Sequence, residues 1–195
     1  MQDFPKPEAV YLGIDTATPF LALALWSPEH GTLARFTERL ERDHAKRLLG
    51  ELDILLKVAG LTKRYIVGVG VGLGPGSYTG LRVGVAAAQG LARGLGVPLG
   101  GGSTLAAVAA GVLTKESSDE AVIALDARRG NVYAGVFTKQ GGTVTSLQNE
   151  RKRERAALQA AYPHLPYFED EAPDASYLAW SLFRGEARAV APVYL

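Results

Sequence analysis

The chain has 195 residues, 47% of them hydrophobic and 21% charged, a composition that indicates a folded globular protein and excludes extended disorder. It contains no cysteine, which excludes disulfides, a thiolate nucleophile and cysteine-ligated metal sites. The 21 Lys and Arg residues nearly balance the 20 Asp and Glu residues, so any contact with nucleic acid has to be local. No segment reads as a signal peptide or approaches the ~20 apolar residues of a membrane span, so we expect a soluble cytoplasmic protein.

The first elements in chain order are a β-hairpin and an amphipathic helix. Residues 10–15 and 19–26 are apolar runs separated by the turn-prone segment 16–19, and a third strand is expected after the next turn. Apolar residues then recur at helical spacing over 43–60, and Gly60 stands where a C-terminal cap is expected.

A glycine-rich strand and loop follow. Residues 65–73 predict a strand whose glycines fall at every second position and therefore on one face. The loop 74–80 leads into a helix over 79–94, with Thr79 as its expected cap. This helix is small and apolar on nearly every side, which predicts that it is enclosed. We interpret the glycines as letting this helix lie tightly on a bare strand, with an anion site as the alternative.

The second half of the chain repeats the beginning. After a short strand near 97–101 and a further helix, residues 121–137 follow the plan of residues 11–25: an apolar strand ending in Asp, a turn, and another apolar strand. Asp126 is thereby matched to Asp15. The repeat is weak in identity but specific in pattern.

The remaining elements complete a fold prediction. We expect a strand at TVTSL, a helix over residues 151–162, a last helix over 177–183, and a strand or tail at the end. Two mixed units of three strands, each followed by alternating helices and strands, predict an α/β, actin-like (ribonuclease-H-like) fold. It would comprise two mixed-sheet subdomains, residues 1–112 and a truncated second subdomain of residues 113–195.

Two aspartates at strand ends could hold a magnesium–nucleotide complex, with structural carboxylates as the alternative. The turn after the second one carries Arg128 and Arg129, where a phosphate loop needs bare backbone, and no Lys-Ser/Thr pair completes a Walker motif in the glycine loop. The weak candidates for nucleotide binding are Asp15, Thr16, Gly74, Gly76, Ser77 and Asp126.

Other chemistry finds little support in the sequence. The three histidines are His30, His44 and His164, which lie far apart, so neither a metal site nor a catalytic residue is expected. A cationic run at 151–155 is typical of a solvated helix face, with RNA contact as the alternative.

Several motifs together carry a family resemblance. The segment GPGSYTGLRVGVAAAQGLA at 74–92, with LGIDTAT near the N-terminus, GGSTLAAVA at 101–109 and LDARRGNVYAGVF at 125–137, resembles the bacterial TsaB (YeaZ-like) family. These are tRNA threonylcarbamoyladenosine biosynthesis proteins related to TsaD. The likeness covers roughly residues 10–140, and the final PVYL resembles that family's ending.

The resemblance implies a noncatalytic subunit that binds and activates a TsaD-like enzyme, which transfers a threonylcarbamoyl group to the adenosine next to the anticodon in tRNA. Where that enzyme has a metal-binding H-x-x-x-H pair, this chain has Thr104 and Val108. The resemblance further implies no cofactor, a homodimer when the chain is alone, and a TsaE-like ATPase in a larger complex. It leaves open whether tRNA contacts this chain.

The two helices over 43–60 and 79–94 are the expected partner surface, because the resemblance implies a four-helix contact between subunits. The candidate interface residues are His44, Arg47, Leu48, Leu52, Gly80, Val83, Gly84, Ala87 and Ala88. The alternative function is an independent actin-like ATPase or small-molecule kinase that uses the loop 74–80 and the two aspartates.

Overall fold

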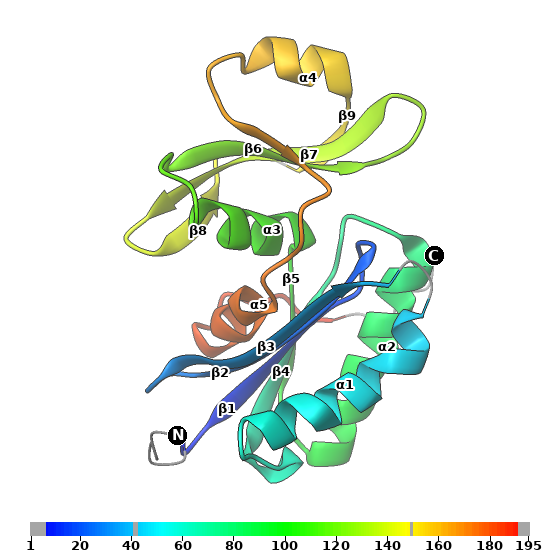
Figure 1. Ribbon diagram of the computed structural model, residues 1–195, viewed down its shortest axis with the longest axis vertical. Helices are drawn as coiled ribbons and strands as arrows, with labels where there is room; N and C mark the ends of the chain where they lie inside the picture. The colour runs from blue at the N-terminus through cyan, green and yellow to red at the C-terminus, as the bar shows by residue number, and fades with distance from the viewer. Residues whose placement is uncertain (1–6, 41–42, 149, 191–195) are drawn as a thin grey trace.

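A computed structural model describes residues 7–40, 43–148 and 150–190. These residues form two lobes, each built on a five-stranded sheet, and the α-helices α3 and α5 lie between the sheets (Figure 1). In chain order the elements are β1 (Val10–Asp15), β2 (Phe20–Ser27), β3 (Gly31–Arg39), α1 (His44–Val58), the 3-10 helix η1 (Lys63–Tyr65), β4 (Ile66–Gly72), α2 (Tyr78–Leu95), β5 (Leu99–Gly102), α3 (Thr104–Leu113), β6 (Glu120–Asp126), β7 (Asn131–Gln140), β8 (Thr143–Ser146), β9 (Arg151–Glu154), α4 (Arg155–Ala161), β10 (Tyr167–Glu169) and α5 (Ala175–Phe183).

The first sheet has the strand order β3-β2-β1-β4-β5. Strand β2 pairs antiparallel with β1 and β3, whereas β4 runs parallel to both β1 and β5. Helices α1 and α2 cover one face of this sheet and α5 covers the other (Figure 1). This order of strands and layers confirms the predicted α/β, ribonuclease-H-like fold.

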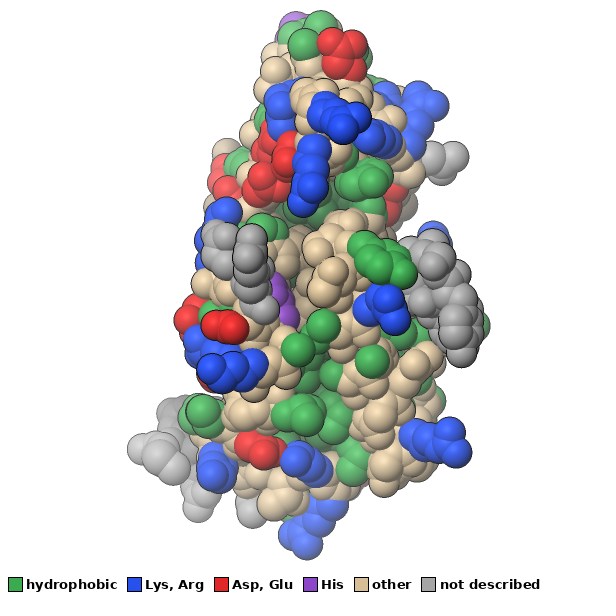
Figure 2. Space-filling view, turned by 90° about the vertical axis from the view of Figure 1, so that its right-hand side faces the viewer, with side chains coloured by type: hydrophobic (Ala, Val, Ile, Leu, Met, Phe, Trp, Pro, Cys, Tyr) green, Lys and Arg blue, Asp and Glu red, His purple; other side chains and the backbone are tan. Residues whose placement is uncertain are grey.

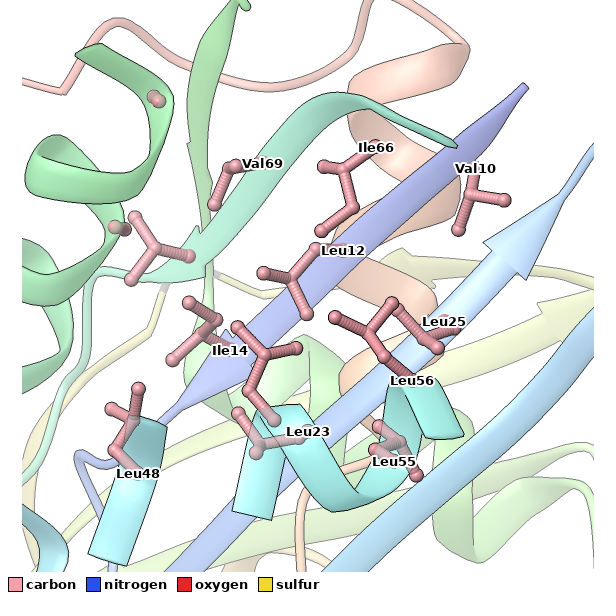
Figure 3. Packing of buried hydrophobic residues seen from close by; sticks show 14 of the residues in the cluster. Val10, Leu12, Ile14, Leu23, Leu25, Leu48, Leu55, Leu56, Ile66 and Val69 are labelled. Carbon is pink, nitrogen blue, oxygen red and sulfur yellow. The ribbon is translucent and has the colours of Figure 1, made fainter. Parts of the chain in front are cut away.

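The largest core lies between the first sheet and α1 and α2. Side chains of a strand alternate between the two faces, so Leu12 and Ile14 of β1 and Val69 of β4 point to the same side. Figure 3 shows Leu12 and Ile14 on the side of β1 that faces Leu48, Leu55 and Leu56 of α1. Complete burial of such side chains contributes about 1.5–3 kcal/mol each, which makes this face the main apolar support of the first lobe.

Two glycines of β4, Gly68 and Gly70, face α5. A Cβ added at Gly70 would overlap the carbonyl oxygen of Leu178, and one added at Gly68 would lie 2.9 Å from the Tyr11 ring. The interpretation that these glycines admit the following helix is therefore wrong. Helix α2 packs on the valine face, and the helix on the bare face comes from near the end of the chain.

The prediction that the helix after the glycine loop is enclosed on nearly every side is also wrong. The residues of α2 that face the sheet are Gly80, Gly84, Val85, Ala88 and Ala92. The opposite side of the helix is exposed and carries Tyr78, Arg82, Ala86, Gly90 and Arg93. Small residues make this outer surface look core-like in sequence although solvent reaches it.

The second sheet has the order β10-β6-β7-β8, with β9 also paired to β7. Helix α3 packs on one face and α4 on the other. The helix predicted over 151–162 is wrong in its first turn, because residues 151–154 form β9 and the helix begins at Arg155. Pairing with β7 satisfies backbone groups of both strands, which outweighs the helical pattern of the charged side chains.

Each sheet is covered by one helix from the other half of the sequence. Helix α3 covers the second sheet although all but its last residue belong to the predicted first subdomain, and α5 covers the first sheet although it belongs to the predicted second one. The division into subdomains at residue 112 stays a prediction. The strand or tail predicted at residues 191–195 lies outside the described residues. Among the described helices, none is long and apolar enough to cross a membrane.

Candidate functional site

Asp15, at the end of β1, is fully buried. Its carboxylate accepts hydrogen bonds from the backbone N–H of Ala17 at 2.8 Å and from the Thr104 hydroxyl at 2.7 Å. Burial raises the pKa of Asp15 to about 6, and these two hydrogen bonds partly oppose the rise. The carboxylate is thus held by this chain's own groups rather than presented to a ligand.

The turn after Asp15 occupies the hollow of the glycine loop. The backbone N–H of Ser77 donates to the carbonyl of Ala17 at 2.7 Å. A Cβ added at Gly76 would overlap that same carbonyl oxygen, and one at Gly80 would overlap the carbonyl of Thr16. The glycines therefore admit the chain's own backbone, in the place where a phosphate-binding loop would hold its ligand.

The start of α2 is capped from within the chain. Ser77, not the predicted Thr79, is the N-cap residue, and its side chain accepts from the backbone N–H of Gly80 at 3.2 Å. The Thr16 hydroxyl donates to the carbonyl of Gly80 at 2.7 Å. Upstream, the backbone N–H of Gly74 donates to the Thr104 hydroxyl at 3.1 Å, and the backbone N–H of Thr104 donates to the Gly74 carbonyl at 2.9 Å. These contacts use donors that an anion would otherwise attract.

Asp126, the matched residue of the second lobe, is in a different setting. Its side chain is 46% exposed and lies 3.1 Å from the guanidinium of Arg155. It also accepts from the backbone N–H of Arg128 at 3.2 Å. Arg155 is shared with Glu169 at 2.6 Å, and this guanidinium lowers the pKa of the Glu169 carboxyl. Arg155, the last residue of the cationic run at 151–155, thus belongs to a cluster of ion pairs.

Residues that could ligate a metal are not gathered in one place. Thr104 and Val108 are fully buried, and Thr104 is engaged with Asp15. No group of three or more His, Asp or Glu side chains with metal-binding geometry occurs among the described residues. His44 is buried in α1, and its Nε2 has no hydrogen-bond partner within the described part of the chain.

The predicted partner surface divides into buried and accessible residues. Those buried inside the first lobe are His44, Leu48, Leu52, Gly80, Gly84 and Ala88. Val83 and Ala87 are half-buried, and Arg47 is paired with Glu38 and Glu51. The small residues spaced by four make room inside the chain, since a Cβ at Gly84 would overlap the Thr16 hydroxyl. A partner can touch only the accessible residues.

The outer surface of α1 and α2 carries apolar side chains. Leu49 is 52% exposed, and Ala86 and Gly90 of α2 are also exposed. Figure 2 shows hydrophobic side chains along the middle of the face of the first lobe that these helices form, flanked by charged side chains. Solvent reaches this strip, and the described residues of the chain leave it uncovered.

Sequence reasoning missed one contact that defines the site and one exposed apolar residue of its surface. The hydroxyl of Thr104 binds Asp15 across 89 positions of the chain, and no spacing rule links them. Leu49 follows buried Leu48 directly, so only its helical angle could separate the two.

Comparisons with known proteins agree with this architecture. Residues 36–188 match the family model described as TsaD, tRNA N6-adenosine threonylcarbamoyltransferase. The tRNA threonylcarbamoyladenosine biosynthesis protein TsaB of Escherichia coli (strain K12) is 40% identical over 122 residues, which are 63% of this chain and 52% of that protein. TsaB of Bacillus subtilis (strain 168) is 33% identical over 136 residues, which are 70% of this chain and 58% of that protein.

The solved structure of YeaZ from Pseudomonas aeruginosa superposes with a TM-score of 0.81 at 27% identity, covering 96% of this chain and all of that one. The chain spans about half the length of the curated relatives it matches. The family model covers well over half of the sequence. The chain therefore belongs to the TsaD-related family, as a TsaB/YeaZ-like member.

Proposed function

We propose that the chain is a noncatalytic subunit of the machinery that makes threonylcarbamoyladenosine in tRNA. It binds a TsaD-like enzyme and activates it for transfer to the adenosine next to the anticodon. Membership of the TsaD-related family and the names of the curated relatives support the pathway.

The observation that carries the noncatalytic role is the occupied glycine loop. The backbone of Thr16 and Ala17 takes the space at Gly76 and Gly80, and Asp15 is bonded to Ala17 and Thr104. A nucleotide phosphate in the glycine loop would have to displace the backbone of Thr16 and Ala17. A kinase or ATPase that bound phosphate there would need this space to be free. This favours the subunit over an independent actin-like ATPase or small-molecule kinase.

The binding surface we assign is the apolar strip of α1 and α2, defined by Leu49, Ala86 and Gly90 with half-buried Val83 and Ala87. Gly90 and Ala86 allow close approach of another helix, and a Leu side chain that becomes buried contributes about 1.5–3 kcal/mol. The same strip would be shared by a second copy of the chain when the enzyme is absent. A TsaE-like ATPase would join elsewhere on the assembled complex.

Activation needs only a difference in affinity between two states of the enzyme. A partner that prefers the active arrangement by about 100-fold shifts the equilibrium by ~2.7 kcal/mol, enough to turn a rarely active enzyme into a mostly active one. No catalytic group from this chain is required.

The test compares two matched leucines. Leu49 and Leu147 are 52% and 50% exposed, but Leu49 lies on the strip and Leu147 on the second lobe. Leu49→Asp should weaken binding to a TsaD-like enzyme from the same cell by at least ~30-fold, because a buried apolar contact is replaced by an unpaired charge. Leu147→Asp should bind as the wild type does. Calorimetry gives the affinities, and reconstituted tRNA modification should follow them.

Two results would overturn the proposal. Equal affinity of both variants would remove the strip as the binding surface. Threonylcarbamoyl transfer or ATP turnover by the purified chain alone would remove the noncatalytic role. As a further control, Asp126→Ala should leave reconstituted modification nearly unchanged, because its carboxylate is engaged by Arg155.

A further inference from the structure

A row of cations lies along one edge of the second sheet. We name as the basic edge Arg128 and Arg129 of the β6–β7 turn together with Arg151, Lys152 and Arg153 of β9. Strand β9 pairs with the start of β7, so Arg153 lies opposite Val132 and Arg151 opposite Ala134. The backbone N–H of Arg155 donates to the carbonyl of Gly130 at 3.0 Å, which places the turn beside the end of β9. Two separate segments thus form one cationic surface.

The charges of the basic edge are not neutralised by acidic side chains of the described residues. Arg128, Arg129, Arg151 and Lys152 are exposed, and none of them forms an ion pair with a described residue. Arg153 binds only the neutral amide of Gln148, at 2.9 Å, and its Nε is buried without a partner among the described residues.

Two other arginines, one beside the basic edge and one in the first lobe, behave differently. Arg155 contacts both Asp126 and Glu169, and Arg47 contacts both Glu38 and Glu51. Glu154 is the one acidic residue within 151–155, so the basic edge keeps a large positive excess.

The turn holds its arginines in an unfavourable backbone conformation. Arg128 and Arg129 have φ of 63° and 55°, the left-handed region that residues with a Cβ rarely adopt. Asn or Gly would form such a turn at lower cost, as Gly130 does at the next position with φ 75°. The geometry of the turn therefore does not explain why arginine stands at positions 128 and 129. We attribute the choice of arginine to a function of the guanidinium groups. Protection of the edge strand from aggregation does not account for them either, since any charge in β9 provides it.

The arrangement suits an extended polyanion. Side chains two apart on a strand are separated by about 7 Å and point to one face, so β9 presents cations on both faces of the sheet edge. Tyr133 lies opposite Lys152, so its aromatic ring is on the same face of the sheet edge as Lys152. Such a row matches successive phosphates of a nucleic-acid backbone better than one compact phosphate group.

We propose that the basic edge binds the phosphodiester backbone of tRNA. This inference rests on the proposed function, which supplies tRNA as the polyanion. In Figure 1 the β6–β7 turn and β9 lie at the right-hand end of the second sheet, the side that Figure 2 brings to the front. Figure 2 shows Lys and Arg side chains gathered on that lobe, above the helices that carry the apolar strip. RNA and enzyme would then lie side by side on one face.

The decisive variant is the double substitution Arg128→Gly and Arg129→Gly, which removes two charges while relieving the left-handed backbone. The charge-retaining control is Arg128→Lys with Arg129→Lys. A charge-matched control at a distance is Arg64→Ala with Arg184→Ala, two exposed arginines of the first lobe. Each form is mixed with its TsaD-like enzyme, and binding of a labelled tRNA transcript is followed by fluorescence anisotropy across a salt series.

The glycine variant should bind tRNA about 10-fold more weakly at 0.15 M salt and lose about two units of salt slope, since each phosphate contact contributes nearly one unit. The lysine variant and the distant variant should keep the wild-type slope. An unchanged slope in the glycine variant would overturn the proposal. Loss of enzyme binding in that variant would also overturn it, by making the basic edge a protein interface.

The same measurement on the chain without enzyme separates this inference from the proposed function. Salt-dependent tRNA binding that needs Arg128 and Arg129, in a chain that fails to bind the enzyme, would support the basic edge while removing the subunit role. If the glycine variant binds the enzyme and its tRNA binding keeps the wild-type salt slope, the subunit role stands and the basic edge is ruled out as a tRNA site.

Discussion

In the hairpin of β1 and β2, Asp15 is fully buried and its turn is inserted into the glycine loop, whereas in the hairpin of β6 and β7, Asp126 is 46% exposed and its turn projects from the sheet edge. The two hairpins pair in nearly the same register, with Asp15 opposite Ala22 and Asp126 opposite Val132. The antiparallel pairing of the two strands is therefore shared, whereas the turns differ, because only the second turn has residues with positive φ.

The surroundings make the difference. Asp15 meets Thr104, a neutral hydroxyl in a dry site, while Asp126 meets the guanidinium of Arg155 at the surface. The same pattern of strand, Asp, turn and strand thus holds buried segments together in the first lobe and forms part of a charged surface in the second. A carboxylate at a strand end is, by itself, no evidence of catalysis, because its neighbours decide what it can do.

The largest effect should come from filling the first turn's space. Gly80→Ala places a Cβ on the carbonyl oxygen of Thr16, so the turn or α2 must move, and we expect a loss of about 3 kcal/mol or more in the free energy of unfolding. Gly90→Ala, in the same helix with nothing near the added Cβ, should instead gain up to about 1 kcal/mol. Urea denaturation checks both. Equal effects would mean that the turn does not fill the loop.

A second comparison uses pH. Asp15 has an ordinary pKa of 3.8 and a folded-state pKa of about 6, so between these values the folded chain keeps a proton that the unfolded chain has lost. The stability that Asp15 contributes is therefore present below about pH 4, lost as the pH rises to about 6, and absent above it. The side chain of Asp15→Asn cannot titrate, so the variant escapes this loss. Between pH 4 and pH 7 its free energy of unfolding, measured relative to that of the wild type, should rise by about 3 kcal/mol.

The matched variant Asp126→Asn removes a surface ion pair and should lower stability by at most about 1 kcal/mol at neutral pH. Its unfolding free energy should follow the wild-type pH profile within that margin over the range in which Asp15 titrates. Parallel profiles for Asp15→Asn and the wild type would contradict the assignment of Asp15 as a desolvated structural carboxylate.

The smallest effect concerns the second turn. Arg129→Gly relieves a left-handed residue at the expense of a more flexible unfolded chain, so a net gain of about 0.5–1 kcal/mol is expected. Arg151→Gly, in the extended backbone of β9, should lose about the same amount. Thermal unfolding distinguishes the signs. A loss in both variants would mean that the turn is not strained.

Much of this protein follows from local pattern in the sequence. Apolar runs separated by turn-prone segments placed β1, β2, β6 and β7, apolar residues at helical spacing placed α1, and a short apolar run placed α5. Gly60 ends α1 with φ 67°, as its position predicts. These features depend on neighbours within a few residues, because hydrogen bonding and side-chain direction in helices and strands are local.

Tertiary structure decided the rest. The partner of the glycine face of β4 is α5, the partner of Asp15 is Thr104, and residues 151–154 became a strand because β7 offered an edge. Burial separated Leu48 from Leu49 on the same helix. Each of these depends on which distant segments meet in space, and a sequence pattern carries the chemistry of a residue but not the identity of the surface that will cover it.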